Sequence, residues 1–233
     1  MKTALTAARW LFILALPVVL ITASLGVAFN SLWLYRYSFE EYRVAQTTGL
    51  DSAELEQAAR GLISYFNSPE DYIDVTVIKD GQPMTLFNER EVIHLYDVKG
   101  LVWLDYRLLL AAGLYCAGFA LWTLWAGGGR HRWQLALGAA GGGGLTLALI
   151  GLLGILMLID FDAIFIRFHL LSFSNDFWQL DPARDYLIML FPGGFWYDAA
   201  LIVVGMSALS ALMLGGVGGW YLWRRGKKQA PAT

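Results

Sequence analysis

Four long apolar stretches are the main feature of the pattern of hydrophobic and polar positions along the chain. They cover residues 10–35, 108–127, 133–159 and 199–223, and none of them contains a charged residue. Because about 20 mostly apolar residues are needed to cross a bilayer, each stretch predicts a membrane-spanning helix. A cleaved signal peptide is an alternative for the first stretch. Its apolar run is longer than the roughly 7–15 residues typical of such peptides, so we expect an uncleaved anchor.

Residues 36–107 are richer in polar side chains and predict a small α+β cap between the first and second spans. Asp51, with Glu54 three residues later, resembles a capping box and predicts a helix over residues 52–66. The pattern becomes helical again at Glu89, and this helix is expected to continue into the second span.

A β-hairpin is predicted within the same cap. Apolar residues alternate with polar ones at Ile73, Val75 and Val77. Asp80-Gly81 is a turn signal, and Met84 to Phe87 can return as a second strand.

Residues 160–198 are too apolar for a simple solvated loop. Their large apolar side chains include Phe161, Ile164, Phe165, Phe168, Leu171 and Phe173. This content predicts a helical segment that lies in the membrane interface, with re-entry into the bilayer as the alternative. Asp181-Pro182 is typical of a helix start and predicts a short helix that ends before Pro192. The expected fold class is therefore an all-α membrane protein in one integral domain, residues 1–233, with four transmembrane helices, the cap and this interfacial segment.

Composition agrees with a membrane protein. The chain is 57% hydrophobic and 15% charged, whereas soluble domains are about 45–50% apolar and about 25% charged. A net charge of −2 excludes a generally basic nucleic-acid-binding protein. Cys116 is the only cysteine in the sequence, which excludes an internal disulfide and a zinc site built from several cysteines.

The distribution of charge predicts the orientation. Residues 1–9, 128–132 and 224–233 hold eight basic and no acidic residues, whereas residues 36–107 and 160–198 hold the other nine basic and all 19 acidic residues. The positive-inside rule therefore predicts that both termini are cytoplasmic and that the two longer segments are extracytoplasmic. Nine of the ten tryptophans lie near a predicted helix end, as in aromatic belts, and Trp178 is the exception.

Two of the three histidines are candidates for chemistry. His94 and His169 come from different extracytoplasmic segments, and each lies a short way from a predicted span. The topology therefore places both on one face at a similar depth, where ionisable groups are costly and are often functional. His131 lies in the short inner loop and is interpreted as a solvated residue.

Several neighbours of the two histidines can orient them, stabilise an oxyanion or position a substrate. Glu91, His94 and Asp97 recur at three-residue spacing, which places them on one face of a helix. A carboxylate there can fix an imidazole tautomer. The residues of interest near His169 are Arg167, Asn175, Asp176 and Trp178. Trp178 can line a lipid entrance or simply pack in the core.

Other catalytic schemes lack their residues. The sequence has no Gly-x-Ser-x-Gly nucleophile elbow and no His-Glu-x-x-His metal motif. Cys116 lies among apolar residues of the second span, where a thiolate is disfavoured. We therefore expect no metal, no cofactor and a substrate that brings its own nucleophile.

The two histidine segments resemble the signatures of a bacterial membrane-protein family, the lipoprotein intramolecular transacylases. The matching stretches are Glu89 to Lys99, and Phe168 to Pro182 followed by Asp185, Leu187-Ile188 and Phe191-Pro192. The layout of four helices with a large first outer segment is also similar. The resemblance covers nearly the whole chain and implies localisation in the bacterial cell membrane.

The resemblance implies a reaction and a substrate. Family members act on bacterial lipoproteins whose N-terminal cysteine carries an S-linked diacylglyceryl group. They move the sn-2 acyl chain to the α-amino group of that cysteine, which leaves a lyso-lipoprotein. By this resemblance His94 and His169 are the catalytic pair, and the expected partners are the diacylated lipoprotein and membrane lipid. A monomer is expected.

Some points stay open on the sequence alone. Either histidine can be the base, although we favour His169, with His94 oriented by Glu91 or Asp97. The resemblance leads us to expect an acidic residue soon after Pro192, but the chain has Gly193-Gly194. A non-enzymatic lipid- or lipoprotein-binding membrane protein is the alternative function.

Overall fold

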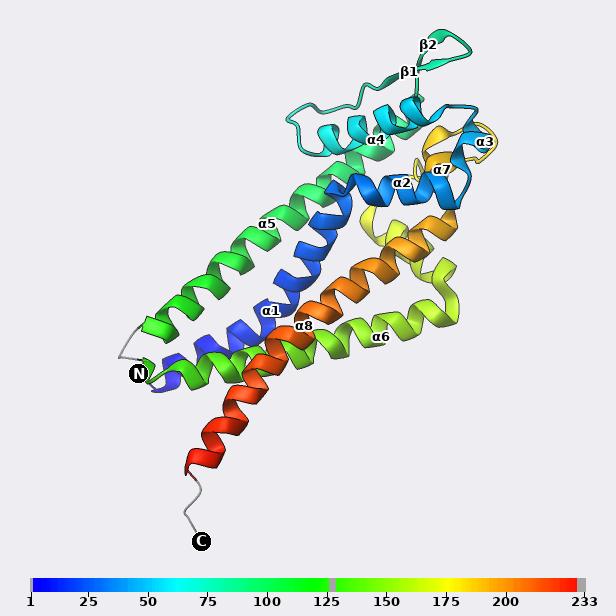
Figure 1. Cartoon of the computed structure of the whole chain (residues 1–233). Coiled ribbons are helices and arrows are strands. Elements are labelled where there is room, and N and C mark those ends of the chain that lie inside the picture. Colours follow the sequence, from blue (N-terminus) through cyan, green and yellow to red (C-terminus); the bar gives the residue numbers. More distant parts are fainter. Residues whose placement is uncertain (1, 126–128, 230–233) are drawn as a thin grey trace. The chain divides into compact units, whose positions relative to one another are not determined.

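The computed structural model describes residues 2–125 and 129–229 (Figure 1). Eight helices and two strands follow one another along this part of the chain. They are α1 (Lys2–Asn30), α2 (Leu32–Glu41), α3 (Val44–Thr48), α4 (Ser52–Phe66), β1 (Thr76–Lys79), β2 (Gln82–Thr85), α5 (Glu89–Trp125), α6 (Arg132–Ser172), α7 (Tyr186–Leu190) and α8 (Gly193–Gln229).

The chain forms two compact units. One, which we call the bundle unit, contains Met1–Leu25, Asp105–Leu158 and Ile202–Thr233. The other, the cap unit, contains Gly26–Leu104 and Ile159–Leu201. Four helices, α1, α5, α6 and α8, are long and apolar enough to cross a membrane. The prediction of four membrane helices with a small sheet between the first two is confirmed.

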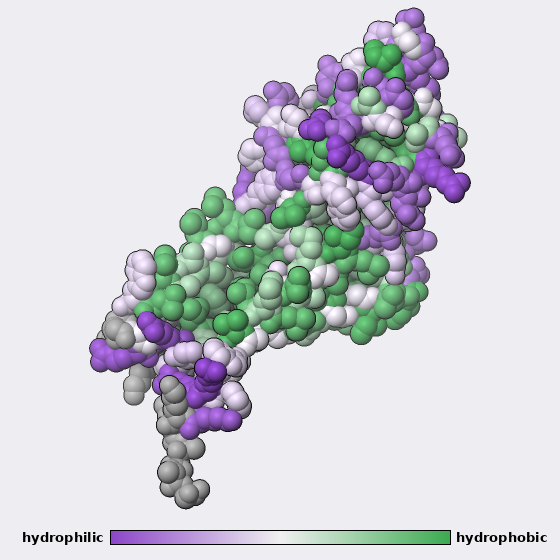
Figure 2. Space-filling view, in the orientation of Figure 1, coloured by the Kyte–Doolittle hydropathy of each residue, from purple (hydrophilic) through white to green (hydrophobic). Residues whose placement is uncertain are grey.

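The bundle unit has a small core and an apolar exterior. Its core residues are Phe12, Leu16, Leu20, Cys116, Phe119 and Ala211. Many large apolar side chains point outward instead, among them Leu110, Leu114, Leu152, Leu158, Leu209 and Val217. Figure 2 shows apolar side chains over much of this unit's visible face. Such an exterior suits lipid, where no water has to be excluded.

Small residues bring α6 and α8 into backbone contact within the bundle unit. A Cβ atom added at Gly143 would lie 2.8 Å from the carbonyl oxygen of Ala211 and 2.9 Å from Cα of Gly215. Both neighbours are backbone atoms, so neither can turn aside. Only glycine at position 143 permits this approach, as in other small-residue interfaces between membrane helices.

The first apolar stretch is not one helix. The expected stretch of residues 10–35 is divided at Ser31, whose backbone is extended, so α1 ends at Asn30 and α2 begins at Leu32. The Asn30 side chain at this break donates a hydrogen bond to the carbonyl oxygen of Gly26, one turn earlier in α1. An apolar pattern continues across such a break, so the sequence did not reveal it.

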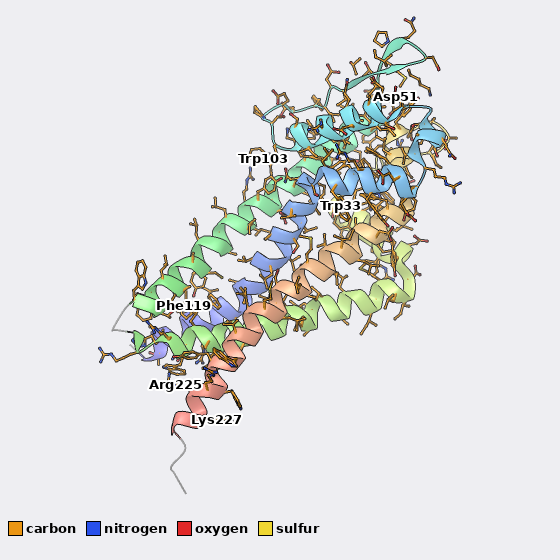
Figure 3. The ribbon with its side chains drawn as sticks, in the orientation of Figure 1. Trp33, Asp51, Trp103, Phe119, Arg225 and Lys227 are labelled. Carbon is orange, nitrogen blue, oxygen red and sulfur yellow. The ribbon has the colours of Figure 1, made fainter. Side chains whose placement is uncertain are left out.

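The cap unit confirms the predicted helix over residues 52–66. Asp51, labelled in Figure 3, caps α4 because its carboxylate accepts hydrogen bonds from the backbone N–H groups of Ala53 and Glu54. The predicted capping box is only half formed. The carboxylate of Glu54 accepts from the backbone N–H of Ile78 on β1 instead of returning to the cap.

The hairpin forms with shifted strand ends. Asp80 and Gly81 have φ angles of 52° and 75°, and Lys79 pairs with Gln82, as expected for a two-residue turn of type I′. β1 starts at Thr76, later than predicted. Val75 packs on α4 instead, where a Cβ at Gly61 would lie 2.6 Å from a Val75 methyl group.

The segment after residue 159 is helical, as predicted, but its second helix starts later. Asp160 has extended backbone angles and its carboxylate accepts from Ala163 N, so residues 161–172 form a distinct part of α6. Residues 182–184 form a turn, and Asp185 precedes α7, so the predicted helix start at Asp181-Pro182 was wrong. α7 ends before Pro192, as expected.

The glycine contact in the bundle unit yields a matched test. We expect Gly143→Ala to destabilise the protein by about 1–3 kcal/mol, because the added methyl group meets backbone atoms of α8. The neighbouring substitution Gly144→Ala is the control, since a Cβ there meets nothing within 4 Å. Thermal unfolding in detergent measures both, and equal midpoints would contradict the contact.

Candidate active site

His94 and His169 lie side by side in the cap unit. His94 is on α5 and His169 on the last turn of α6, with 6.0 Å between ring centroids and 32° between ring planes. Each histidine is 7% exposed. The structure therefore brings together the two residues that the sequence singled out, although they are 75 positions apart along the chain.

The protonation of His169 follows from its hydrogen bond. Its Nδ1 lies 2.7 Å from the carbonyl oxygen of Phe165, one helical turn earlier. A carbonyl oxygen only accepts hydrogen bonds, so Nδ1 carries the hydrogen and donates it. In the neutral ring the lone pair is then on Nε2, which is the tautomer that can take up a proton there.

His94 differs from His169 in its hydrogen bonding. Its Nδ1 is buried and has no hydrogen-bond partner in the structure. The nearest aromatic ring is that of Phe173, 5.1 Å away and almost perpendicular, at 80°. Among the residues that the structure describes, no group fixes the hydrogen on Nδ1, so the hydrogen-bonding capacity of this buried nitrogen is unmet.

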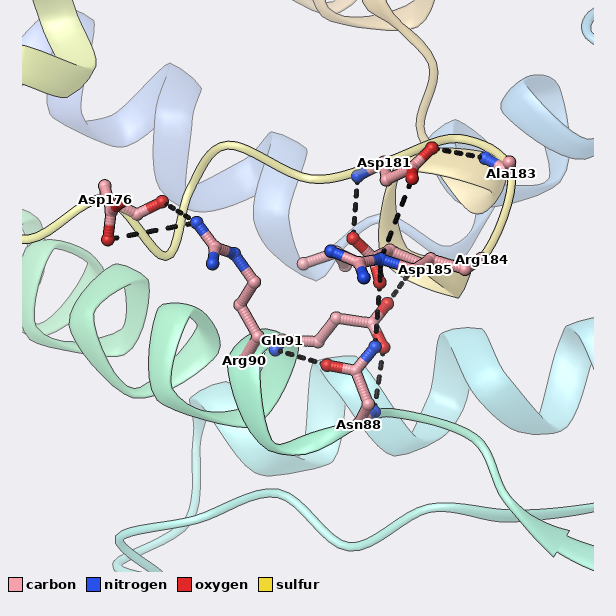
Figure 4. A network of polar contacts seen from close by, with 9 residues as sticks. Asn88, Arg90, Glu91, Asp176, Asp181, Ala183, Arg184 and Asp185 are labelled. Atoms are coloured by element: carbon pink, nitrogen blue, oxygen red, sulfur yellow. Dashed lines mark hydrogen bonds and ion pairs between the residues drawn. The ribbon is translucent and has the colours of Figure 1, made fainter.

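Glu91 does not orient His94 directly. Its carboxylate accepts hydrogen bonds from the backbone N–H of Asn88 at 2.8 Å and of Leu187 at 2.6 Å (Figure 4). The Asn88 side chain in turn accepts from the backbone N–H of Glu91. This reciprocal pair is a capping box at the start of α5, and the bond to Leu187 joins it to α7. Glu91 therefore fixes where the helix carrying His94 begins.

Asp185 is a second buried carboxylate that sequence reasoning missed as a site residue. It is 1% exposed and accepts from the Asn88 side-chain amide at 2.9 Å and from Asp181 N at 2.6 Å. Arg184 approaches it at 3.5 Å (Figure 4). One local signal could have pointed to this network, the Asn-x-x-Glu sequence at residues 88–91 before an apolar run, which indicates a capping box. That signal does not reveal the residues at α7 with which the box forms hydrogen bonds.

Asp97 and Asn175 bind each other. The Asn175 amide donates to the Asp97 carboxylate at 2.8 Å, and its oxygen accepts from Phe177 N. Asp97 thus holds the loop after α6 and not the ring of His94. Asn175, expected as an oxyanion donor, is engaged by these two contacts.

Arg90 holds the next residue of the same loop. Its guanidinium donates to the backbone oxygen of Asp176, lies 3.9 Å from the Asp176 carboxylate and sits over the ring of Phe177 (Figure 4). Arg90 and Asp97 thus lie one turn before and after His94 and fasten consecutive loop residues. This loop carries Trp178, whose ring centroid is 4.8 Å from that of His169. Arg167 is exposed and is not drawn into this set of contacts.

The glycine pair after Pro192, where an acid was expected, has a packing role. A Cβ at Gly194 would lie 2.6 Å from the ring of Tyr42, so the glycine makes room for that phenol. Tyr42 and Tyr37 both donate to the carboxylate of Asp198, at 2.6 and 2.8 Å. Burial and the bond to Asp198 raise the pKa of Tyr42, which therefore stays a neutral donor. Among residues 2–125 and 129–229, no group of three or more His, Cys, Asp or Glu is arranged to hold a metal.

Comparisons with known proteins agree with this architecture. The family model of the lipoprotein intramolecular transacylase Lit matches residues 10–196. A structure of the Bacillus cereus Lit enzyme has a TM-score of 0.81 at 18% identity and covers 98% of this chain and 100% of that one.

Two variant structures of the same Bacillus cereus enzyme also match. A variant with a histidine replaced by arginine has a TM-score of 0.76 at 18% identity, covering 98% and 96% of the two chains. A variant with a histidine replaced by alanine has a TM-score of 0.76 at 17% identity, covering 97% of each chain. At this identity the likeness shows the fold alone. No curated protein matches the chain.

The capping box leads to a test of what positions His94. We expect Glu91→Ala to cost about 1–3 kcal/mol of stability in the cap unit, because the buried N–H of Leu187 loses its acceptor. Amide hydrogen exchange across residues 185–191 should speed up. Glu89→Ala removes an exposed carboxylate from the same helical turn and should leave this exchange unchanged. Equal exchange in both variants would show that the bond does not hold α7.

Proposed function

Because the chain belongs to the lipoprotein intramolecular transacylase family, we propose that His94 and His169 catalyse the acyl transfer within a bacterial lipoprotein. The proposed substrate is an N-terminal cysteine with an S-linked diacylglyceryl group, and the proposed donor position is sn-2. The observation that carries this proposal is the contact between the two imidazoles, of which one has its tautomer fixed by a backbone carbonyl.

The reaction needs no group from outside the substrate and the two rings. The α-amine attacks the ester carbonyl, a C–N bond forms, and the bond to the glycerol oxygen breaks. Counted from the ammonium form, two protons leave the nitrogen, of which one is returned to the glycerol oxygen and the other is released to water. An α-amino group with a pKa of about 7.7–8.0 is largely protonated at neutral pH, so a base is required. Nucleophile and ester are tethered to each other, which makes an acyl-enzyme unnecessary.

His169 is the proposed base. Its Nδ1 donates to the Phe165 carbonyl, so Nε2 is the nitrogen with the free lone pair. His94 is the proposed partner that donates to the oxyanion or to the glycerol oxygen. Its buried Nδ1 lacks a protein partner, and a substrate oxygen would remove that cost.

The setting of the pair suits a lipid substrate. The last turns of α6, which carry His169, expose apolar side chains at Ile166, Phe168, Leu170 and Leu171. Such a surface favours contact with acyl chains over contact with water. For this multi-pass membrane protein we further propose cytoplasmic termini and a site on the extracytoplasmic side, since the basic residues gather at the opposite ends of the spans.

The catalytic proposal predicts the effect of three histidine substitutions. His94→Ala and His169→Ala should each lower the transfer rate by about 10²–10⁴, the usual contribution of a general acid or base. His131→Ala is the control and should keep the wild-type rate. The assay uses purified protein with a synthetic diacylated lipopeptide whose sn-1 and sn-2 chains differ in length, followed by mass spectrometry of the N-acylated product.

Two results would count against it in different ways. Wild-type transfer rates in both His94→Ala and His169→Ala would contradict the two-histidine mechanism. Transfer of the sn-1 chain to nitrogen would leave that mechanism standing and overturn the proposed donor position.

The orientation is tested by single cysteines in a Cys116→Ser background. Asp74→Cys is exposed in the cap unit, and Lys227→Cys lies near the end of α8. In intact spheroplasts a membrane-impermeant maleimide should label position 74, and position 227 should react only after lysis. The reverse labelling order would invert the proposed topology.

A further inference from the structure

Aromatic rings surround His169 on several sides. The ring centroids of Phe165 and Trp178 lie 4.3 and 4.8 Å from that of the imidazole, and those of Phe168 and Phe173 lie 5.3 and 5.5 Å away. Trp178 is the one tryptophan that the membrane-interface pattern leaves unexplained. We propose that Trp178 is a positioning residue that stabilises His169 while that histidine carries the proton during acyl transfer. This inference rests on the proposed function.

The first step of the argument concerns charge. A base that takes up a proton becomes an imidazolium, and buried cations need compensation. In the part of the chain that the structure describes, no carboxylate is hydrogen-bonded to His169. The nearby acids are engaged elsewhere, Glu91 by backbone N–H groups and Asp97 by Asn175. The groups that do face His169 are the Phe165 carbonyl, the aromatic rings and His94.

The second step concerns which aromatic ring suits a cation. The negative face of an aromatic ring attracts a cation within about 6 Å of its centroid, and indole is the strongest of the natural rings in this role. Trp178 meets that condition, with its plane tilted by 36° from the imidazole plane. Phe165 is nearer to the imidazole, at 4.3 Å, but its benzene ring attracts a cation less strongly than an indole does. Trp178 is therefore the ring within reach whose face is expected to attract the protonated imidazole most strongly.

The third step concerns how Trp178 is held. Its loop is fastened to α5 by Asp97 to Asn175 and by Arg90 to Asp176. Within the loop the backbone N–H of Leu180 donates to the carbonyl oxygen of Trp178. These bonds place the indole beside the imidazole before any substrate arrives. Preorganised groups of this kind cost little reorganisation at the moment of reaction.

The experiment changes the electrostatics of the indole at nearly constant shape. Nonsense suppression at codon 178 inserts tryptophan itself, as the reference, or its mono-, di- or trifluorinated form. For each protein kcat and KM are measured with the synthetic diacylated lipopeptide. Fluorine withdraws charge from the ring face, so kcat should fall stepwise along the series with little change in KM. Trp178→Leu removes the ring, and we expect about a tenfold or larger loss of kcat, with Trp178→Phe in between.

The control series places the same fluorinated residues at Trp33, which stacks on Tyr37 away from any histidine contact. There kcat should stay constant. A flat kcat along the Trp178 series in an active enzyme would overturn the proposal and leave a packing role. A change confined to KM would also overturn it, since that result indicates substrate contact. An inactive wild-type protein, detected before any substitution, would instead refute the proposed function.

Discussion

The buried carboxylate of Glu91 satisfies backbone N–H groups from two segments at once, and the geometry of the site depends on that arrangement. A buried carboxyl group needs hydrogen-bond donors from the protein, and Glu91, at 0% exposure, has Asn88 N and Leu187 N as donors. These bonds fix both the first residue of α5 and the position of α7. Once the helix start is set, the helical repeat places Arg90, His94 and Asp97 in the orientations that the loop after α6 requires.

The site that results has few charges at its centre. Two imidazoles and several aromatic rings lie together, and the carboxylates form a surrounding layer that binds backbone and amide groups. This separation suits the proposed chemistry. In that proposed chemistry the tethered substrate supplies both the nucleophile and the ester, so the protein has to hold them, move protons and keep the rings in place. A carboxylate touching the base is one way to do this, and a carbonyl with aromatic faces is another.

Local signals in the sequence predicted local features well. The apolar runs predicted the four long helices, Asp51 predicted the start of α4, and Asp80-Gly81 predicted the turn of the hairpin. The order of the predicted spans was enough to predict that His94 and His169 lie on the same face. The failures have two physical causes, a competing local hydrogen bond and a partner far along the chain. Asp181-Pro182 has the form of a helix start, but the N–H of Asp181 bonds to Asp185, and the helix begins after that residue. Glu91 shares a helix face with His94, yet its partners are Asn88 and Leu187, and spacing carries no information about the latter.

The hydrogen bond from His169 to Phe165 joins the final turn of α6 to the turn before it. The backbone N–H of Phe173 closes this turn on the carbonyl oxygen of His169. Helix ends open more readily than the rest of a fold, and fraying of this one turn would release the imidazole from its carbonyl while the rest of α6 and the other membrane helices stayed intact. The orientation of the proposed base therefore depends on the stability of the last turn of its helix. A protein that is folded and correctly inserted can still lose its activity when that turn opens.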